Sequence, residues 1–268
     1  TRLFQFLPGA PPPQVALANN VLWRNNGNGT FSDLTQATGL AGPGSSFGAV
    51  ATDFNNDRGM DLVVTGDGKG APGIYINPRE GRFQPIEPWA APMPAPALGL
   101  AVFDFDKDGW MDLACTHGGG PGLTLWRNSE AKRVEPVPLP QLDWQRGWGL
   151  SALDFDNDGW LDLAAVGETS AGQGRIVLLR NRGPEGFENV SATVGLTALK
   201  LKSPRALITA DYDGDGDTDL LATQNGGPVV LLRNAGGNKN NWLRISLKGL
   251  ADNKSAIGTK VEVFAGAL

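Results

Sequence analysis

The stretch Asp154-Phe-Asp-Asn-Asp-Gly-Trp-Leu-Asp-Leu163 places carboxylates at positions 1, 3, 5 and 9 of a short loop and a glycine at position 6. Oxygen ligands at alternate residues can converge on one point when the backbone curls. The glycine allows a positive φ at the sharpest bend, and the residue at position 7 can offer its carbonyl oxygen. Such a loop suits a hard cation, and calcium is the expected occupant.

Three near copies of this loop occur in the chain, and their first aspartates are 51, 50 and 57 residues apart. Each copy follows an apolar run and ends in Asp-Leu. Acidic turns that bind nothing are the alternative interpretation, but four loops at nearly constant spacing favour a repeat architecture. The other copies are Asp53-Phe-Asn-Asn-Asp-Arg-Gly-Met-Asp-Leu62, Asp104-Phe-Asp-Lys-Asp-Gly-Trp-Met-Asp-Leu113 and Asp211-Tyr-Asp-Gly-Asp-Gly-Asp-Thr-Asp-Leu220.

The loops differ from EF-hands, which need a bidentate glutamate at position 12 and helices on both sides. Position 12 is Val64, Cys115, Ala165 and Ala222 in the four loops, and the flanking segments are short and strand-like. The aspartate at position 9 is therefore expected to close a shorter loop between two β-strands.

The charge of the chain is concentrated in these loops. They hold sixteen of the 28 acidic residues, and the formal net charge is −5. Without metal the carboxylates of one loop should repel one another, and bound cations should relieve this repulsion. The chain has no basic run, so nucleic acid is not an expected partner.

Cysteine and histidine are nearly absent. One Cys and one His allow neither a disulfide framework nor a zinc site, and Cys115 is expected in the core. His117 is expected to be a solvated residue at a strand end, with a catalytic base as the less favoured alternative. Neither a signal peptide nor a transmembrane segment is recognised in the sequence.

A second marker repeats with the same period. Strand-like segments end at five asparagines, Asn25, Asn77, Asn128, Asn181 and Asn234, which are 52, 51, 53 and 53 residues apart. The first segment continues through an Asn- and Gly-rich turn to Phe31, which is typical of a β-hairpin. Each unit is thus predicted to run strand, cation loop, strand, turn, strand, turn, strand. The sequence predicts an all-β fold, a β-propeller of four-stranded blades with four cation loops and five outer hairpins.

Aromatic residues are expected mainly between blades. Phe54, Phe105, Phe155 and Tyr212 occupy position 2 of the loops and should point away from the carboxylates. Trp89, Trp144 and Trp148 fall in or beside the connections between blades. They are the best candidates for a ligand-facing surface, although packing is the favoured role.

The chain divides into three regions. Residues 1–20 include a proline-rich stretch and are predicted to form an extended segment. Residues 21–240 hold the propeller repeats. From residue 241 to residue 268 two alternating strands are expected without a cation loop.

The repeat unit resembles the FG-GAP or VCBS repeats of integrin-α-like β-propellers. The resemblance rests on Phe47-Gly48, the DxDxDGxxDL loops and the hairpin Leu22-Trp-Arg-Asn-Asn-Gly-Asn-Gly-Thr-Phe31. The segment from Asn241-Trp-Leu-Arg-Ile-Ser-Leu-Lys-Gly249 to Ile257-Gly-Thr-Lys-Val-Glu-Val263 resembles the start of the ASPIC/UnbV segment of the cartilage acidic protein-like family.

The resemblance implies up to four calcium ions, each held by four side chains and one backbone carbonyl. Because Asn55 removes one charge and Arg58 replaces the glycine, the first loop is expected to bind most weakly. The carbonyls would come from Gly59, Trp110, Trp160 and Asp217. The side chains would be those of Asp53, Asn55, Asp57 and Asp61; Asp104, Asp106, Asp108 and Asp112; Asp154, Asp156, Asp158 and Asp162; and Asp211, Asp213, Asp215 and Asp219.

Propellers of this family are expected to have seven blades, which exceeds the four loops seen here. The missing blades could lie in other sequence, or the hairpin at residues 21–35 could pair with residues 242–264 to close a smaller ring. Open blade edges would otherwise allow association with another chain.

The favoured function is a calcium-stabilised, non-enzymatic scaffold for adhesion or protein interaction, with its ligand on the loop face of the propeller. The alternatives are a carbohydrate-binding propeller and, less favoured, a polysaccharide-active enzyme. Calcium loops are useful where calcium is abundant, so a secreted, extracellular or periplasmic location is expected.

Overall fold

The computed structural model describes residues 19–42, 46–66 and 71–236, together with a few positions beyond them, 240, 242–243, 245–249, 259, 261 and 263. The predicted extended segment at residues 1–20 lies almost wholly outside this part. Most of the predicted ASPIC/UnbV-like segment lies outside it as well.

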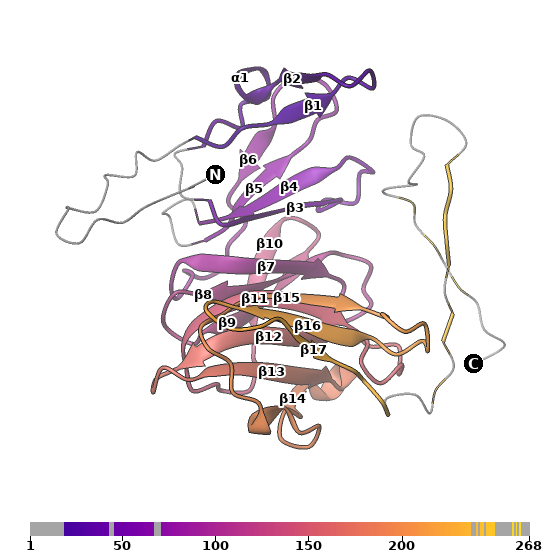
Figure 1. Ribbon diagram of the computed structural model, residues 1–268. Helices are drawn as coiled ribbons and strands as arrows, with labels where there is room; N and C mark the ends of the chain where they lie inside the picture. Colours follow the sequence, from indigo (N-terminus) through magenta and orange to yellow (C-terminus); the bar gives the residue numbers. More distant parts are fainter. Residues whose placement is uncertain are drawn as a thin grey trace, which may run out of the picture.

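The described residues form antiparallel sheets that follow one another along the chain, as in a β-propeller (Figure 1). A hairpin of β1 (Trp23–Asn25) and β2 (Phe31–Asp33) comes first. Three four-stranded blades follow, and the last sheet has three strands. The blades consist of β3 (Gly48–Thr52), β4 (Asp61–Thr65), β5 (Gly73–Ile76) and β6 (Gln84–Ile86); β7 (Ala97–Phe103), β8 (Asp112–His117), β9 (Leu123–Ser129) and β10 (Arg133–Val137); β11 (Trp144–Leu153), β12 (Asp162–Thr169), β13 (Gly174–Asn181) and β14 (Phe187–Asn189); and β15 (Pro204–Ala210), β16 (Asp219–Gln224) and β17 (Val230–Leu232).

Helix is nearly absent from the described chain. It is limited to α1 (Thr35–Thr38) and the 3₁₀ turns η1 (Gly183–Glu185) and η2 (Leu196–Ala198). No helix in this part is long and apolar enough to cross a membrane. Each cation loop joins the first and second strands of its blade, which confirms the predicted order within the repeat.

The core lies between blades rather than within them, because a single small sheet cannot bury both faces. Phe54 of the first blade packs with Leu113, Trp126 and Val134 of the second. Similar clusters join the second blade to the third and the third to the fourth. The predicted packing of Phe54, Phe105 and Phe155 between blades is therefore confirmed. Tyr212 is an exception, since the residue is 53% exposed and no sheet follows β17 in the described part.

Glycines allow the first strands of neighbouring blades to approach closely. A Cβ at Gly149 of β11 would lie 2.8 Å from Ala206 Cα of β15 and closer still to the Leu207 nitrogen. Gly99 of β7 lies against Thr116 and the carbonyl of Trp148 in the same way. The Thr116 hydroxyl also donates to the Trp148 carbonyl at 2.5 Å, which ties the second blade to the third.

The fourth sheet departs from the predicted pattern. A fifth outer hairpin was expected after Val229, but β17 ends at Leu232 and has no partner beyond β16 among the described residues. The predicted pairing of the hairpin at residues 21–35 with residues 242–264 involves a second segment that lies mostly outside the described part.

Candidate metal centres

The four acidic loops share one backbone arrangement, built on short hydrogen bonds within each loop. The N–H of position 6 donates to the carboxylate of position 1, and the N–H of position 7 donates to the carboxylate of position 5. The first set joins Arg58 to Asp53 at 3.0 Å, Gly109 to Asp104 at 2.9 Å, Gly159 to Asp154 at 2.9 Å and Gly216 to Asp211 at 3.2 Å. The second joins Gly59 to Asp57 at 2.6 Å, Trp110 to Asp108 at 2.8 Å, Trp160 to Asp158 at 2.9 Å and Asp217 to Asp215 at 3.0 Å.

The aspartate at position 9 is buried in all four loops, and both of its oxygens accept backbone hydrogen bonds. In the third loop Asp162 accepts from the N–H of Phe155 at 3.0 Å and from the N–H of Asn181 at 2.7 Å. This residue therefore joins the start of the loop to the end of the third strand. The same pair of bonds is made by Asp61, Asp112 and Asp219.

The asparagine that ends each third strand links consecutive blades. The side-chain amide of Asn181 donates to the carbonyl of Leu161 in its own blade and, at 2.7 Å, to the carbonyl of Phe105 in the preceding blade. Asn128 and Asn234 make the same two contacts with Met111 and Phe54 and with Thr218 and Phe155. The asparagine period therefore matches the loop period because Asn128, Asn181 and Asn234 each hold two consecutive loops, whereas the side-chain amide of Asn77 donates to Met60 within its own blade.

Three of the loops bring carboxylate oxygens together at a spacing that suits one cation. In each group one oxygen per residue lies within 4.8 Å of the others, and the groups are Asp104, Asp106 and Asp108; Asp154, Asp156 and Asp162; and Asp211, Asp213 and Asp219. Asp156 Oδ1 is buried without a hydrogen-bond partner and could coordinate a cation, and Asp53 Oδ1 of the first loop is in the same state. The residues thus fit a hard divalent ion with oxygen ligands. The roles of the remaining predicted side chains and of the position 7 carbonyls stay predictions.

Burial disfavours the charged form of several of these carboxylates. It raises the pKa of Asp112 and of Asp162 to about 7, and the backbone N–H donors offset only part of this effect. Burial, together with the neighbouring Asp158, also raises the pKa of Asp156. A divalent ion among these groups would favour the charged form and offset this cost.

Arginines at the end of the third strands form ion pairs with the loop carboxylates. The sequence had not indicated this role. Arg180 pairs with Asp156 at 2.6 Å and with Asp158 at 2.9 Å. Arg127 and Arg233 contact positions 3 and 5 of their loops in the same way. The pKa of Arg180 is raised because it donates a hydrogen bond to Asp158. The available signal was the arginine that precedes Asn128, Asn181 and Asn234.

The first loop differs from the others. It forms no group of three converging carboxylates, although all its residues are described. Arg58 has a φ of 69° at position 6, where the glycines have φ between 86° and 91°. This conformation is unfavourable for a residue with a Cβ. That the first loop binds most weakly stays a prediction.

Arg58→Gly is expected to stabilise the protein by about 1 kcal/mol, because glycine adopts a positive φ without steric cost. The thermal midpoint in calcium should rise by about 2–4 °C. The reciprocal variant is Gly109→Arg, at a site with φ 86° and nothing within 4 Å of the added Cβ, and it should lower the midpoint by a similar amount. A lower midpoint for Arg58→Gly would mean that the arginine side chain contributes more than its backbone conformation costs.

The expectation of a solvated His117 is wrong. The ring is fully buried, its Nδ1 lies 2.9 Å from the Ala95 carbonyl and its Nε2 lies 2.7 Å from the Thr124 hydroxyl. Burial lowers the pKa of His117, so the neutral ring is favoured. Cys115 is buried as expected, and burial raises the pKa of its thiol to about 12.

The tryptophans considered for a ligand surface take part in packing. Trp144 is 6% exposed, and Trp89 packs edge to face against Trp126 with ring centroids 5.4 Å apart. The guanidinium of Arg205 lies 4.3 Å from the Trp148 ring centroid. Packing, the favoured role, therefore describes all three residues.

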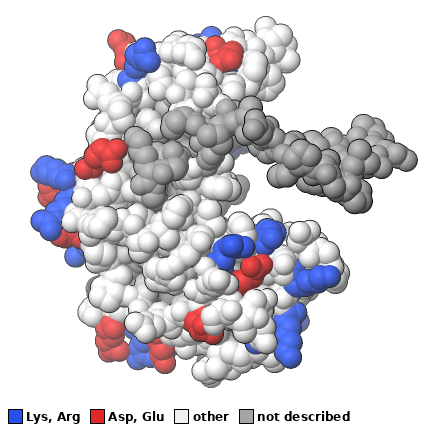
Figure 2. All heavy atoms as spheres, turned by 90° about the vertical axis from the view of Figure 1, so that its left-hand side faces the viewer, with Lys and Arg blue, Asp and Glu red and all other residues white. Residues whose placement is uncertain are grey.

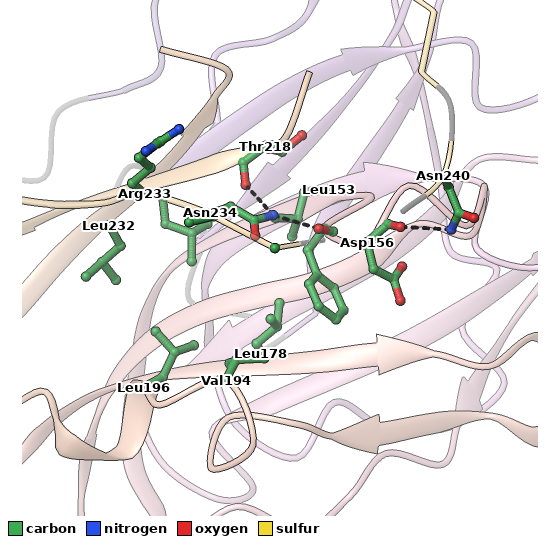
Figure 3. Close-up of a pocket in the computed structure, with 14 residues that line it drawn as sticks. Leu153, Asp156, Leu178, Val194, Leu196, Thr218, Leu232, Arg233, Asn234 and Asn240 are labelled. Atoms are coloured by element: carbon green, nitrogen blue, oxygen red, sulfur yellow. Dashed lines mark hydrogen bonds between the residues drawn. The ribbon is translucent and has the colours of Figure 1, made fainter. Parts of the chain in front are cut away.

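A cavity of about 570 Å³ borders the third loop (Figure 3). Its apolar wall includes Phe155, Leu178 and Leu196, and Asp156 and Asn240 lie beside it. One blade earlier, at the second loop, the ring of Phe105 packs against Phe187 from β14, the fourth strand of the third blade, with centroids 6.0 Å apart. The cavity next to Phe155 corresponds to the place that a fourth strand would fill beside β17.

Charged side chains outside the loops form no large patch of one sign on the face shown in Figure 2. Basic and acidic groups lie beside one another there, and much of the visible surface is uncharged.

Two solved structures are similar to the chain only at low sequence identity. One is described as specific recognition of non-reducing terminal N-acetylglucosamine by an Agrocybe aegerita lectin, with 20% identity, a TM-score of 0.46, and coverage of 75% of this chain and 53% of that one. The other is the pore of the Photorhabdus luminescens Tc holotoxin, with 17% identity, a TM-score of 0.35, and coverage of 75% and 11%.

Curated relatives match most of the chain. Cartilage acidic protein 1 of Homo sapiens and that of Mus musculus are each 30% identical over 233 residues, and the Xenopus tropicalis protein is 28% identical over 236 residues. Each match covers 84% of this chain but 28% of the relative. The chain thus spans little more than a quarter of the length of these relatives.

A family model described as FG-GAP-like repeat matches residues 15–64, 53–115, 104–165 and 154–222. Each matched unit ends shortly after a cation loop. The second, third and fourth units begin at residues 53, 104 and 154, which are the first positions of the first three loops. The resemblance of residues 15–222 to FG-GAP repeats is confirmed, and the chain belongs to the FG-GAP-like repeat family.

Proposed function

We propose that this chain is a calcium-stabilised, extracellular β-propeller that binds another protein and catalyses no reaction. The observation that carries the proposal is the convergence of three carboxylates in each of three loops, at the same place in successive repeats. In each blade the loop joins the first two strands, so a bound ion would crosslink them. It would also favour the folded state, because the unfolded chain has no preformed site.

The environment of the one histidine and the one cysteine supports a scaffold role over a catalytic one. His117 is buried between the Ala95 carbonyl and Thr124, and Cys115 is buried with its thiol protonated. Neither residue is therefore available as a general base or a nucleophile. Trp144 is buried, and Trp89 and Trp148 are half-buried and packed against Trp126 and Arg205, so a protein ligand is favoured over a carbohydrate. The extracellular location is proposed because oxygen-rich loops of this kind function where calcium is abundant.

The test is a thermal melt of the purified chain in calcium, in magnesium and in excess chelator, together with a count of bound ions. Three ions at concentrations about 100-fold above their Kd would each stabilise the fold by about 2.7 kcal/mol. The midpoint should therefore rise by at least about 10 °C in calcium, and less in magnesium. Equal midpoints under the three conditions, with no ion bound, would overturn the proposal.

Two variants make this test specific. Asp156→Asn removes one converging carboxylate and should lower the count by one ion. Glu130→Gln removes an exposed carboxylate that pairs with Lys132 outside the loops, and it should leave the count unchanged. A protein partner, once identified, is expected to bind in calcium and to dissociate when a chelator is added.

A further inference from the structure

The residue at position 4 of each loop has an unusual backbone conformation. Asn56, Lys107 and Asn157 have φ values of 56°, 62° and 54°, and Gly214 has 79°. Positive φ is uncommon for residues other than glycine and is most often tolerated by asparagine and aspartate. Because a positive φ occurs at position 4 in all four loops, it is a feature of the repeat.

The side chain at position 4 contacts the loop of the following blade. The amide of Asn56 donates to the Gly109 carbonyl at 3.0 Å. The ammonium of Lys107 lies 4.0 Å from the ring centroid of Trp160. Both contacts reach position 6 or 7 of the next loop, although they use different chemistry.

The contact between the third and fourth loops is double. The amide of Asn157 donates to the Gly216 carbonyl at 3.4 Å and to the carboxylate of Asp217 at 3.0 Å. These are positions 6 and 7 of the fourth loop, and their N–H groups hold the carboxylates of Asp211 and Asp215. Asn157 therefore contacts the part of the fourth loop that orients its carboxylates.

We propose that the position 4 residues are positioning residues that couple ion binding in adjacent loops. An ion in one loop fixes that loop's backbone and with it the position 4 side chain. The side chain then orders positions 6 and 7 of the next loop, so the second ion meets a loop that is already ordered. The coupling is reciprocal and should be strongest between the third and fourth loops. The inference rests on the proposed calcium binding.

The test uses terbium(III) as the probe, because Trp160 lies within the third loop and can sensitise its emission. The full chain carries Trp110→Phe and Trp242→Phe, so that the tryptophan of the second loop and the tryptophan beside Gly216 of the fourth loop no longer contribute. Asp213→Asn then weakens the fourth loop by removing one of its three converging carboxylates. In this background it should lower the terbium affinity of the third loop by about five-fold or more.

The coupling is then removed with Asn157→Gly. Glycine suits the positive φ, and it is the residue found at the same position of the fourth loop, Gly214. In this variant Asp213→Asn should leave the affinity of the third loop unchanged. The matched control, Asn56→Gly, cuts the contact between the first and second loops and should preserve the effect of Asp213→Asn on the third.

The outcomes separate this inference from the proposed function. An equal effect of Asp213→Asn with Asn157 and with glycine at that position would overturn the coupling while leaving ion binding intact. Absence of terbium and calcium binding in the unsubstituted chain would overturn both. Circular dichroism of each variant establishes that the altered affinities come from folded protein.

Discussion

Gly149→Ala is expected to destabilise the protein by about 3 kcal/mol or more, the upper range for inserting a methyl group into a packed site. The added Cβ would lie 2.8 Å from the Cα and carbonyl carbon of Ala206, which belong to the backbone of the next blade. No rotamer change can relieve such a contact, so β11 and β15 would have to separate. The thermal midpoint in calcium should fall by about 6–12 °C.

Two other glycines provide a graded series for this prediction. A Cβ at Gly48 would meet Thr65 Oγ1 at 3.2 Å and the Leu98 carbonyl at 3.7 Å, so Gly48→Ala should change stability by less than about 1 kcal/mol. Gly119 has nothing within 4 Å of the added Cβ, and Gly119→Ala should have almost no effect. Three equal shifts would contradict close packing of the first strands as the reason for glycine at position 149.

The sequence predicted the features that depend on neighbouring residues. The bonds from Gly159 to Asp154 and from Trp160 to Asp158 span a few residues, so the spacing of the carboxylates was sufficient to predict the loop. The order of strands within a blade followed from the same local pattern. The asparagine period was recognised as well, but its physical cause lies in contacts such as that of Asn128 with Phe54, 74 residues away.

The burial of two residues was predicted wrongly. His117 looks like a strand-end residue in the sequence, but its ring nitrogens lie against Ala95, just before β7, and Thr124 of β9. Tyr212 follows the same pattern as Phe54, yet it is exposed because no further sheet covers it among the described residues. A local pattern specifies which side a residue faces, whereas burial also requires a partner on that side.

The ion pairs between arginines and loop carboxylates were also not predicted. Arg180 lies on β13, more than twenty residues after the carboxylates that it contacts. The register of β12 with β13 brings the two segments together, and this register is set by the pairing of residues such as Leu163 with Leu179. Arginine at a strand end is common on protein surfaces, so its identity alone did not indicate a role in the loop.

Asp162→Ala is expected to destabilise the protein severely even when no metal is bound, whereas Asp156→Ala should matter only in calcium. Asp162 is fully buried and accepts the N–H groups of Phe155 and Asn181, so its loss leaves two buried donors unpaired at about 1–3 kcal/mol each. The midpoint in chelator should fall by at least about 6 °C. Asp156 has a carboxylate oxygen without a partner and accepts no backbone hydrogen bond from another residue of the loop.

The comparison of the two variants separates the structural role of position 9 from its role toward a metal. Both residues belong to the same converging group, so both variants should lose the part of the calcium-induced rise in midpoint that comes from the third loop. In chelator only Asp162→Ala should be destabilised. If that variant does not fold, Asp162→Asn keeps one acceptor oxygen for the two N–H groups and should be intermediate. Equal midpoints of Asp156→Ala and Asp162→Ala in chelator would show that the hydrogen bonds of Asp162 do not hold the blade together. The metal alone would then account for the burial of a carboxylate between two strands.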